Sequence, residues 1–173
     1  MQTAPSSSTA GAPVDAFEFL RQDHARVARL FAEFDALQGA PAADRQRVAQ
    51  IVQEVSAALA MHAQLEEEIF YPAAERALGD ERLVKQAREE HAQAKETIRR
   101  LTTMQPDDAQ LAPSVAQLAR EVTDHVRMEE QALFEQLRGR LDATAVGAQL
   151  AQRRGQLEST AERPEDDYPV ENV

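Results

Sequence analysis

The chain has 173 residues, a length that favours one domain with a substantial hydrophobic core. Its formal net charge of −11 argues against a basic face that would neutralise phosphates, and so against nucleic acid and an anionic membrane surface as partners. The absence of cysteine excludes disulfide bonds, thiolate metal sites and cysteine nucleophiles.

The first thirteen residues predict neither export nor membrane insertion. They are rich in Ser, Thr, Ala and Pro, without the basic start or the apolar run of a signal peptide. No stretch of the chain approaches the roughly 18 apolar residues that a transmembrane helix needs. We therefore expect a cytoplasmic protein with a disordered segment over residues 1–13.

Four amphipathic helices are predicted in the middle of the chain, because apolar residues recur there at alternating steps of three and four. Their apolar stripes run from Phe17 to Phe34, from Val48 to Ile69, from Leu83 to Leu101 and from Val115 to Ala132. Breaker residues separate the stripes at Gly39-Ala40-Pro41, at Gly79-Asp80 and between Pro106 and Pro113. The short connections predict an all-α fold, an antiparallel up-down-up-down four-helix bundle over residues 14–142.

The C-terminal part, residues 143–173, is predicted to be less regular. Residues 143–158 suit a further short helix, whereas from about Ser159 the sequence turns acidic and loses apolar periodicity. We expect a disordered acidic tail that increases solubility.

Every histidine of the chain falls on one of the four apolar stripes, one in each predicted helix, and two glutamates fall on them as well. A single histidine on such a stripe more often packs in the core, but four together weaken that interpretation. Taking a glutamate out of water is costly unless it is paired or bound to a metal, and no Lys or Arg shares these stripes. Imidazole and carboxylate together suit iron, manganese or zinc. The sequence therefore predicts a metal site made of His24, His62, Glu66, His91, His125 and Glu129.

A weak internal repeat strengthens this prediction. The second and fourth predicted helices carry the same His-x-x-x-Glu element, which places both side chains on one helix face, and a phenylalanine follows each element. The two copies are His62-x-x-x-Glu66 with Phe70, and His125-x-x-x-Glu129 with Phe134. Six such donors are too many for one tetrahedral zinc. They suit two six-coordinate ions, each with two histidines, bridged by both carboxylates and by an oxo or hydroxo group.

The order of these elements resembles the hemerythrin-like family, also called the HHE cation-binding domain, over about residues 15–140. The resemblance rests on Asp23-His24, on the element from His62 to Glu66 with the following Glu67-Glu68-Ile69-Phe70-Tyr71-Pro72, on Glu90-His91, and on the element from His125 to Glu130. It implies an antiparallel four-helix bundle with a non-haem di-iron centre. It also implies binding of dioxygen or nitric oxide, action on peroxide, or sensing of iron and oxygen.

Carried over position by position, the resemblance implies a role for each of the six residues. The bridging carboxylates would be Glu66 and Glu129. The two histidine pairs, one for each iron, would be His24 with His62 and His91 with His125.

The third helix departs from the oxygen-carrying members of this family. Those proteins have two histidines four residues apart there, whereas Ala87 and Lys95 stand four residues before and after His91. Their second bridging carboxylate is usually an Asp five residues after the last histidine, whereas Glu129 follows at four. The missing histidine argues against a dedicated reversible oxygen carrier and permits redox chemistry at an iron with an extra open position.

Several residues near these elements receive predictions of their own. Tyr71 could support the metal ligands from outside, although packing is the favoured prediction, and Glu67 and Glu68 are assigned to solvent. The place of the missing histidine is left to a water or to another glutamate, such as Glu67 or Glu90.

The rival ferritin-like di-iron bundle needs Glu-x-x-His pairs. Three residues before the four histidines stand Arg21, Leu59, Arg88 and Val122, so that pattern is absent.

Our leading hypothesis is a cytoplasmic non-haem di-iron protein that binds or turns over a small oxidant, such as dioxygen, hydrogen peroxide or nitric oxide. Whether it is an enzyme stays open, with catalase-like consumption of peroxide as the first enzymatic candidate. The alternative is an iron- or oxygen-responsive sensor without turnover. A structural zinc or manganese bundle is a third hypothesis.

Overall fold

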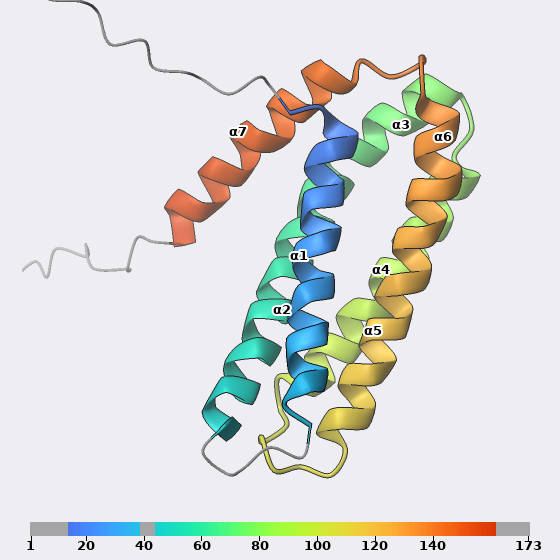
Figure 1. The fold of residues 1–173 in the computed structure, drawn as a ribbon. Coiled ribbons are helices and arrows are strands. Elements are labelled where there is room, and N and C mark those ends of the chain that lie inside the picture. The colour runs from blue at the N-terminus through green and yellow to red at the C-terminus, as the bar shows by residue number, and fades with distance from the viewer. Residues whose placement is uncertain (1–13, 39–43, 162–173) are drawn as a thin grey trace, which may run out of the picture.

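The computed structural model describes residues 14–38 and 44–161 of the chain (Figure 1). The segment 1–13, the break at Gly39-Ala40-Pro41 and most of the acidic tail lie outside the described residues. Within the described part, no helix is long and apolar enough to cross a membrane.

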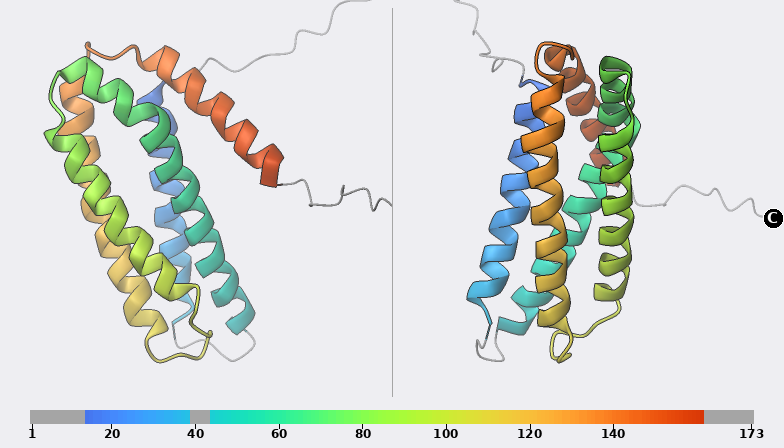
Figure 2. Two further views of the ribbon diagram at one scale, coloured as in Figure 1. Left: turned by 180° about the vertical axis from the view of Figure 1, so that it is seen from behind. Right: turned by 90° about the vertical axis from the view of Figure 1, so that its right-hand side faces the viewer.

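Four long helices form the antiparallel bundle that the sequence predicts (Figures 1 and 2). They are α1 (Ala16–Ala36), α2 (Arg45–Leu65), α4 (Arg82–Leu101) and α5 (Leu111–Met128). The first begins at Asp15, whose side chain accepts a hydrogen bond of 2.9 Å from the backbone N–H of Glu18 and so satisfies one of the free donors of the first turn. The predicted fold class is confirmed.

The second and fourth predicted helices continue beyond α2 and α5. Each passes through a five-residue π-helical segment into a short α-helix: η2 (Glu66–Phe70) into α3 (Tyr71–Leu78), and η3 (Glu129–Leu133) into α6 (Phe134–Leu137). The N–H of Tyr71 donates to the carbonyl of Glu66, and the N–H of Phe134 donates to the carbonyl of Glu129. Both hydrogen bonds reach back five residues, so each segment is a π-turn inside a longer helix.

A fifth helix, α7 (Ala143–Ala161), packs against the outside of the bundle (Figure 1). It is longer than the short helix predicted for residues 143–158, and it lies against α1 and α2 with Val146 and Leu150 buried. A Cβ added at Gly147 would stand 2.4 Å from the backbone carbonyl oxygen of Val14. A larger residue would push α7 away, so Gly147 permits the close crossing of α7 over the start of α1.

A polar layer divides the hydrophobic core into two clusters along the bundle. One cluster contains Leu20 and Leu65, and the other contains Val27 and Val55. On α1 the buried His24 follows Leu20 by four residues and precedes Val27 by three, so it lies between the two clusters. The predicted metal ligands therefore lie at mid-height in the bundle, with apolar side chains above and below.

Candidate metal centre

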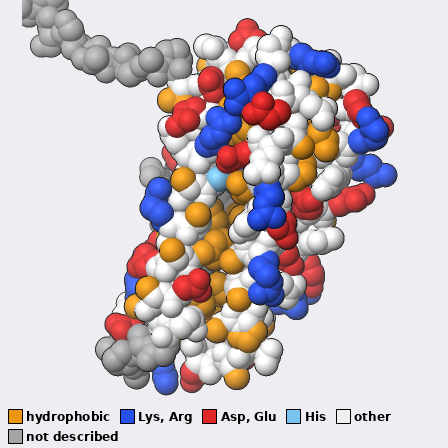
Figure 3. All heavy atoms as spheres, turned by 45° about the vertical axis from the view of Figure 1, so that its right-hand side comes forward, with side chains coloured by type: hydrophobic (Ala, Val, Ile, Leu, Met, Phe, Trp, Pro, Cys, Tyr) orange, Lys and Arg blue, Asp and Glu red, His pale blue; other side chains and the backbone are white. Residues whose placement is uncertain are grey.

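The structure brings all six predicted metal ligands into one buried layer, referred to below as the ligand layer. The two glutamates are fully buried, and the four histidines keep exposed fractions of 4–8%. Figure 3 shows one histidine side chain at the surface within a strip of hydrophobic side chains. The layer consists of His24 from α1, His62 from α2, Glu66 from η2, His91 from α4, His125 from α5 and Glu129 from η3.

The ligand layer contains two overlapping groups of potential metal ligands. In each group, the ligand atoms all lie within 4.8 Å of one another. The first group is His24, His62, Glu66 and Glu129, and the second is Glu66, His91 and His125. Glu66 belongs to both groups and therefore lies where they overlap.

Both carboxylates lie between the two histidine pairs. Oε2 of Glu66 lies 3.2 Å from Nε2 of His62 and 3.2 Å from Nε2 of His91. Oε2 of Glu129 lies 3.5 Å from Nε2 of His24 and 3.5 Å from Nε2 of His125. Each carboxylate thus contacts one histidine of each pair.

Each histidine is oriented by a carboxylate that lies outside the ligand layer. Its Nδ1 atom contacts a carboxylate oxygen of a neighbouring helix, which leaves the Nε2 lone pair directed inwards. These outer carboxylates and their Nδ1 distances are Asp23 to His62 at 3.4 Å, Glu67 to His91 at 3.0 Å, Glu90 to His125 at 2.9 Å and Glu130 to His24 at 2.8 Å.

The outer carboxylates form a closed ring around the bundle. Each of them is the sequence neighbour of a residue in the ligand layer, and each reaches the histidine of the next long helix in chain order. The order is α1 to α2, η2 to α4, α4 to α5 and η3 back to α1. Every helix of the bundle therefore supplies an inner ligand and also holds the histidine of its neighbour.

Tyr71 contributes a seventh polar side chain to the ligand layer. It is fully buried, and its hydroxyl donates a hydrogen bond of 2.8 Å to Oε1 of Glu129. The same hydroxyl oxygen lies 3.3 Å from Oε2 of Glu66 and 3.3 Å from Nε2 of His91. The hydroxyl thus touches both carboxylates beside His91, so the favoured prediction of packing is wrong and the alternative, a side chain that supports the ligands, holds.

The π-turns explain why Tyr71 points into the ligand layer. In an α-helix the fifth residue after Glu66 would face away from it, but a π-turn needs more residues per turn and brings that residue back to the same face. Phe134 holds the same position after Glu129, and its ring stacks on His24 at 6.4 Å. Tyr71 and Phe134 therefore occupy equivalent positions in the two repeats, whereas the sequence comparison matched Phe70 with Phe134.

The polar atoms of the ligand layer fit a metal better than they fit one another. Five buried side-chain polar atoms in the described residues have no hydrogen-bond partner, and four belong to this layer: His24 Nε2, His62 Nε2, Glu66 Oε1 and Glu129 Oε2. Buried polar atoms are seldom left unpaired, because each costs free energy. In addition, the Nε2 atoms of His91 and His125 lie only 3.1 Å apart, where a shared cation is favourable. The donor set thus fits a bound metal.

The pKa values indicate that the buried carboxylates of the ligand layer require positive charge close to them. Burial and the charge of Glu129 raise the pKa of Glu66 well above its usual value. Burial would raise the pKa of Glu129 too, but its hydrogen bond to His24 and the charges of the histidines lower it to about 2. For His24, burial is outweighed by the same two glutamates, which raise its pKa to about 9. Burial lowers the pKa of His62 to about 4. Without a metal, the layer balances its carboxylates with retained protons.

No Lys or Arg side chain from the described residues contacts Glu66 or Glu129, in agreement with the apolar stripes. Lys95, in the position of the missing histidine, turns outwards, and its Nζ lies 2.7 Å from Oε1 of Glu67. Glu67 and Glu90 both contact the outer Nδ1 atoms of histidines, so neither takes the inner place of the missing ligand. The hydroxyl oxygen of Tyr71, 3.3 Å from Nε2 of His91, does lie inside the layer.

A buried layer of histidines and carboxylates in an antiparallel bundle defines a class of metal-binding helical proteins. The Hemerythrin HHE cation binding domain matches residues 15–160. The chain therefore belongs to the Hemerythrin HHE cation-binding family, as the sequence elements indicate. The match includes α7, beyond the four helices of the bundle.

Two known proteins are similar to this chain. A Hemerythrin HHE cation binding domain-containing protein from Mycobacterium kansasii has a crystal structure that matches with a TM-score of 0.70 over 86% of this chain and 90% of that one, at 20% identity. At that identity the likeness shows the fold. A protein of Nostoc sp. (strain PCC 7120) described as a DNA nickase is 29% identical over 126 residues, 73% of this chain. The chain spans 34% of the length of that protein.

Sequence reasoning found the six inner residues and missed the side chains that support them. The assignment of Glu67 to solvent is wrong, because it contacts His91 and Lys95. Glu68 is more exposed and pairs with Arg153 of α7. One signal for the outer carboxylates was present: an acidic residue stands next to a layer residue in each of the four helices.

Proposed function

We propose that the chain is a non-haem di-iron protein that binds or reacts with a small oxidant, such as dioxygen, hydrogen peroxide or nitric oxide. The observation that carries the proposal is the placement of Glu66 and Glu129 between the two histidine pairs. Two adjacent ions with mixed imidazole and carboxylate ligands suit iron, and such a pair supplies redox chemistry that side chains alone lack. A cytoplasmic location and the absence of nucleic-acid and membrane partners stay predictions.

The side chains around the proposed irons have separate tasks. His24 and His62 would hold one ion, His91 and His125 the other, and the outer carboxylates fix each imidazole with Nε2 inwards. The hydroxyl of Tyr71 holds Glu129 in place and offers a proton donor beside His91. The apolar clusters on either side of the layer limit the access of water.

The first test is the metal content of freshly purified protein, with absorption spectra before and after addition of peroxide. Near two irons per chain, with near-UV bands that change on peroxide addition, support the proposal. One zinc per chain, or colourless protein that takes up no ferrous iron under anaerobic conditions, would overturn it.

The bridging role is tested by Glu66→Ala and Glu129→Ala. Each variant is expected to lose iron together with the bands of a bridged ferric pair, because each carboxylate contacts both histidine pairs. Glu135→Ala is the matched control, since Glu135 is exposed on α6 and its ion pair among the described residues is with Arg138. Two irons retained by both bridging variants would contradict the assignment.

A sensor is the second candidate function, and one observation favours it. Arg154 of α7 forms an ion pair with Asp23, and Asp23 contacts Nδ1 of His62. A single carboxylate thus joins the C-terminal helix to the ligand layer. A change of metal occupancy or redox state that moved His62 would alter the docking of α7.

Hydrogen exchange of the α7 backbone amides separates the two candidates. A sensor predicts different exchange rates in metal-free, reduced and oxidised protein, and Arg154→Gln should abolish the difference. Equal rates in all three states count against the sensor. If α7 amides exchanged faster in the metal-free protein, but the metal-bound protein showed no reaction with peroxide, the result would count against the oxidant-binding function instead.

A further inference from the structure

Cationic side chains lie behind three of the four outer carboxylates. Each of these three carboxylates contacts a histidine of the ligand layer and also forms an ion pair with a Lys or Arg side chain. The pairs are Asp23 with Arg154, Glu67 with Lys95, and Glu130 with Arg21. Three histidines are thus joined to a cation through one carboxylate each.

Glu90 is the outer carboxylate without such a cation. Among the described residues, no ion pair joins it to a Lys or Arg side chain, and its Oε1 atom instead accepts a hydrogen bond of 2.8 Å from the neutral amide of Gln86. Its Oε2 atom lies 2.9 Å from Nδ1 of His125. The negative charge beside His125 is therefore not balanced by a paired cation.

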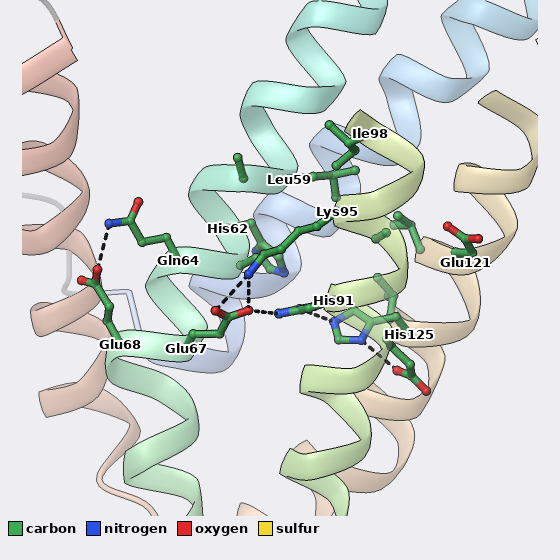
Figure 4. A pocket seen from close by; sticks show the side chains of 16 residues that line it. Leu59, His62, Gln64, Glu67, Glu68, His91, Lys95, Ile98, Glu121 and His125 are labelled. Carbon is green, nitrogen blue, oxygen red and sulfur yellow. Dashed lines mark hydrogen bonds and ion pairs between the residues drawn. The ribbon is translucent and has the colours of Figure 1, made fainter. Parts of the chain in front are cut away.

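His91 gives the sharpest contrast, because it belongs to the same histidine pair as His125 (Figure 4). Its Nδ1 atom lies 3.0 Å from Oε1 of Glu67, and Nζ of Lys95 lies 2.7 Å from the same oxygen. The Nδ1 distances of His91 and His125 differ little, at 3.0 and 2.9 Å. The two imidazoles therefore differ in the charge behind the carboxylate rather than in the length of the contact.

The charge behind a carboxylate changes how strongly its imidazole binds a metal. A carboxylate that accepts the N–H of an imidazole makes the other ring nitrogen a stronger donor to the metal. A cation beside the carboxylate opposes this effect, because it attracts the same negative charge. A neutral amide opposes it less, since hydrogen bonds between ionised groups are roughly twice as strong as neutral ones.

By this criterion His125 is the strongest donor of the four histidines. Asp23 lies 3.4 Å from Nδ1 of His62, a long contact, and it also pairs with a cation. Glu130 lies only 2.8 Å from Nδ1 of His24, but a guanidinium stands 3.7 Å from its other oxygen. Only His125 combines a short contact with an unpaired carboxylate.

We propose that Glu90 is a positioning residue that acts through His125 and makes the ion bound there the more easily oxidised of the two. A stronger donor favours ferric over ferrous iron, because the higher positive charge gains more from it. Lys95 limits the effect, since it acts in the opposite direction through Glu67. The inference rests on the proposed di-iron function and deepens it, because it assigns the first electron to one ion.

This assignment places the first electron beside a proton donor. A ferrous ion that becomes ferric releases one electron, which the small oxidant of the proposed function accepts. The hydroxyl of Tyr71 lies 3.3 Å from Nε2 of His91, on the same ion. Electron and proton would then reach the oxidant from one side of the ligand layer.

Potentiometric titration of the full chain, loaded with two irons, tests the proposal, and the electrode accepts the electron that each ferrous ion loses. Gln86→Lys supplies the missing cation four residues before Glu90, where the two side chains are neighbours on one helix face. It should raise the lower of the two reduction potentials by about 59 mV, which is a tenfold shift of the equilibrium towards ferrous iron. Lys95→Gln removes the cation from Glu67 and should shift the same potential the opposite way.

Ala92→Lys is the matched control for added charge. It places a lysine at an exposed position of α4 two residues beyond Glu90, where the side chain does not face that carboxylate. Both potentials should stay close to their wild-type values, because solvent screens an exposed charge. Gln86→Lys combined with Lys95→Gln should also restore the wild-type potential. Equal shifts by Gln86→Lys and Ala92→Lys, or shifts of the same sign by Gln86→Lys and Lys95→Gln, would overturn the proposal.

Nitrogen NMR of histidine-labelled, zinc-loaded protein tests the same asymmetry without redox chemistry. Among the four Nδ1 signals, that of His125 should lie farthest towards the position of imidazolate, and Glu90→Gln identifies it. Gln86→Lys should move this signal back and leave those of His24 and His62 in place. A His125 signal that does not differ from the other three would contradict the role of Glu90.

The two proposals fail in different ways. Protein that holds two irons, but whose potentials respond to neither Gln86→Lys nor Lys95→Gln, overturns the role of Glu90 and leaves the di-iron function. Protein that takes up zinc but no iron overturns the di-iron function, and the nitrogen signals then decide whether Glu90 distinguishes His125. Protein that takes up neither metal overturns both.

Discussion

The His24 corner of the ligand layer is covered by aromatic rings and is called the closed side below, whereas a cavity adjoins the His91–His125 side, which is called the open side. The ring of Phe134 stacks on His24 at 6.4 Å, and Phe17 lies 5.1 Å from Phe134. His24 is the one histidine of the layer that does not line the cavity. On the other side, the hydroxyl of Tyr71 lies 3.3 Å from Nε2 of His91. A cavity of about 440 Å³ between α2, α4 and α5 adjoins His91 and His125 (Figure 4).

Much of this difference between the two sides comes from one position that the two repeats share, Tyr71 in one and Phe134 in the other. Tyr71 and Phe134 each follow a π-turn, five residues after a layer glutamate, so the two repeats direct one aromatic ring each towards the layer. One ring carries a hydroxyl and the other covers a histidine. The repeat thus builds two similar halves of a metal site, and the side chains that follow it make them unequal. We expect the reaction with oxidant on the Tyr71 side.

Removing the metal should have the largest effect, because it affects both sides at once. Ions that bind only the folded chain stabilise it by about 4 kcal/mol at a thousandfold excess over Kd. For a chain of this size, that corresponds to a fall in Tm of roughly 8–16 °C on chelation. Thermal unfolding monitored by circular dichroism, before and after chelation, measures it. An unchanged Tm would mean that the layer is held without a metal.

The metal-free protein should also lose stability as pH rises from 6.5 to 9. The pKa of His24 is raised to about 9 in the folded chain, so its protonated form adds stability that is complete below its unfolded pKa of 6.5. That contribution disappears as pH passes from 6.5 to 9. Glu66, whose pKa is also raised, changes stability with the same sign. Urea unfolding of chelated protein at pH 6.5 and 9 tests this, and equal stabilities would contradict it.

Substitutions in the ring of outer carboxylates compare the two sides directly. Asp23→Asn beside His62 and Glu90→Gln beside His125 should each weaken metal binding roughly ten- to hundredfold, because an imidazole loses its orienting partner. Competition with a chelator measures the affinity. Asp23 also pairs with Arg154, so only Asp23→Asn should speed hydrogen exchange in α7. Faster α7 exchange in both variants would show that the coupling does not run through Asp23.

Exchanging the two aromatic residues should change reactivity more than metal content. Tyr71→Phe is expected to retain two irons and to react several-fold more slowly with peroxide, because the proton donor beside His91 and the hydrogen bond to Glu129 are lost. Phe134→Tyr adds a hydroxyl on the closed side and serves as the matched control. If Tyr71→Phe reacted at the wild-type rate, the hydroxyl would have no part in the reaction.

The smallest effect is expected for the contact between α7 and the closed side. Arg154→Ala removes the ion pair with Asp23 and the stacking of the guanidinium over Phe19 at 4.1 Å. Partly exposed contacts of this kind contribute about 1 kcal/mol. Urea unfolding measures the loss, with Arg138→Ala as an exposed control. A loss as large as that caused by chelation would show that α7 is part of the core instead.

The bundle and its six inner residues were predictable because both depend on helix periodicity alone. His62 and Glu66 share one helix face at a spacing of four, where α2 continues into η2, whatever the neighbouring helices are. A buried glutamate without a cation then indicates a metal on energetic grounds. None of these steps needs the tertiary structure.

The missed features depend on backbone irregularity or on neighbouring helices. The periodicity of an α-helix assigns Tyr71 to another face, and only the π-turn after Glu66 turns it into the layer. The role of Glu67 depends on its contact with His91 of the next helix. The docking of α7 depends on Gly147 and the backbone at Val14, a contact that its own weak apolar pattern does not indicate.

The ring of outer carboxylates also records the handedness of the bundle. Successive residues of a helix point about 100° apart. Two outer carboxylates come one residue before a layer histidine, and the other two come one residue after a layer glutamate. Because neighbouring helices run in opposite directions, one residue back on one helix and one residue forward on the next turn in the same sense around the bundle.

If the four helices followed one another in the opposite sense around the bundle axis, each outer carboxylate would have to occupy the sequence position on the other side of its neighbouring layer residue. Those positions hold Ala25, Leu65, Ala92 and Met128, none of which can accept a proton from an imidazole. The mirror-ordered bundle would therefore leave all four histidines without their outer partners. In this family, the side on which an acidic residue flanks each ligand should indicate, from the amino-acid sequence alone, which way round the helices are ordered.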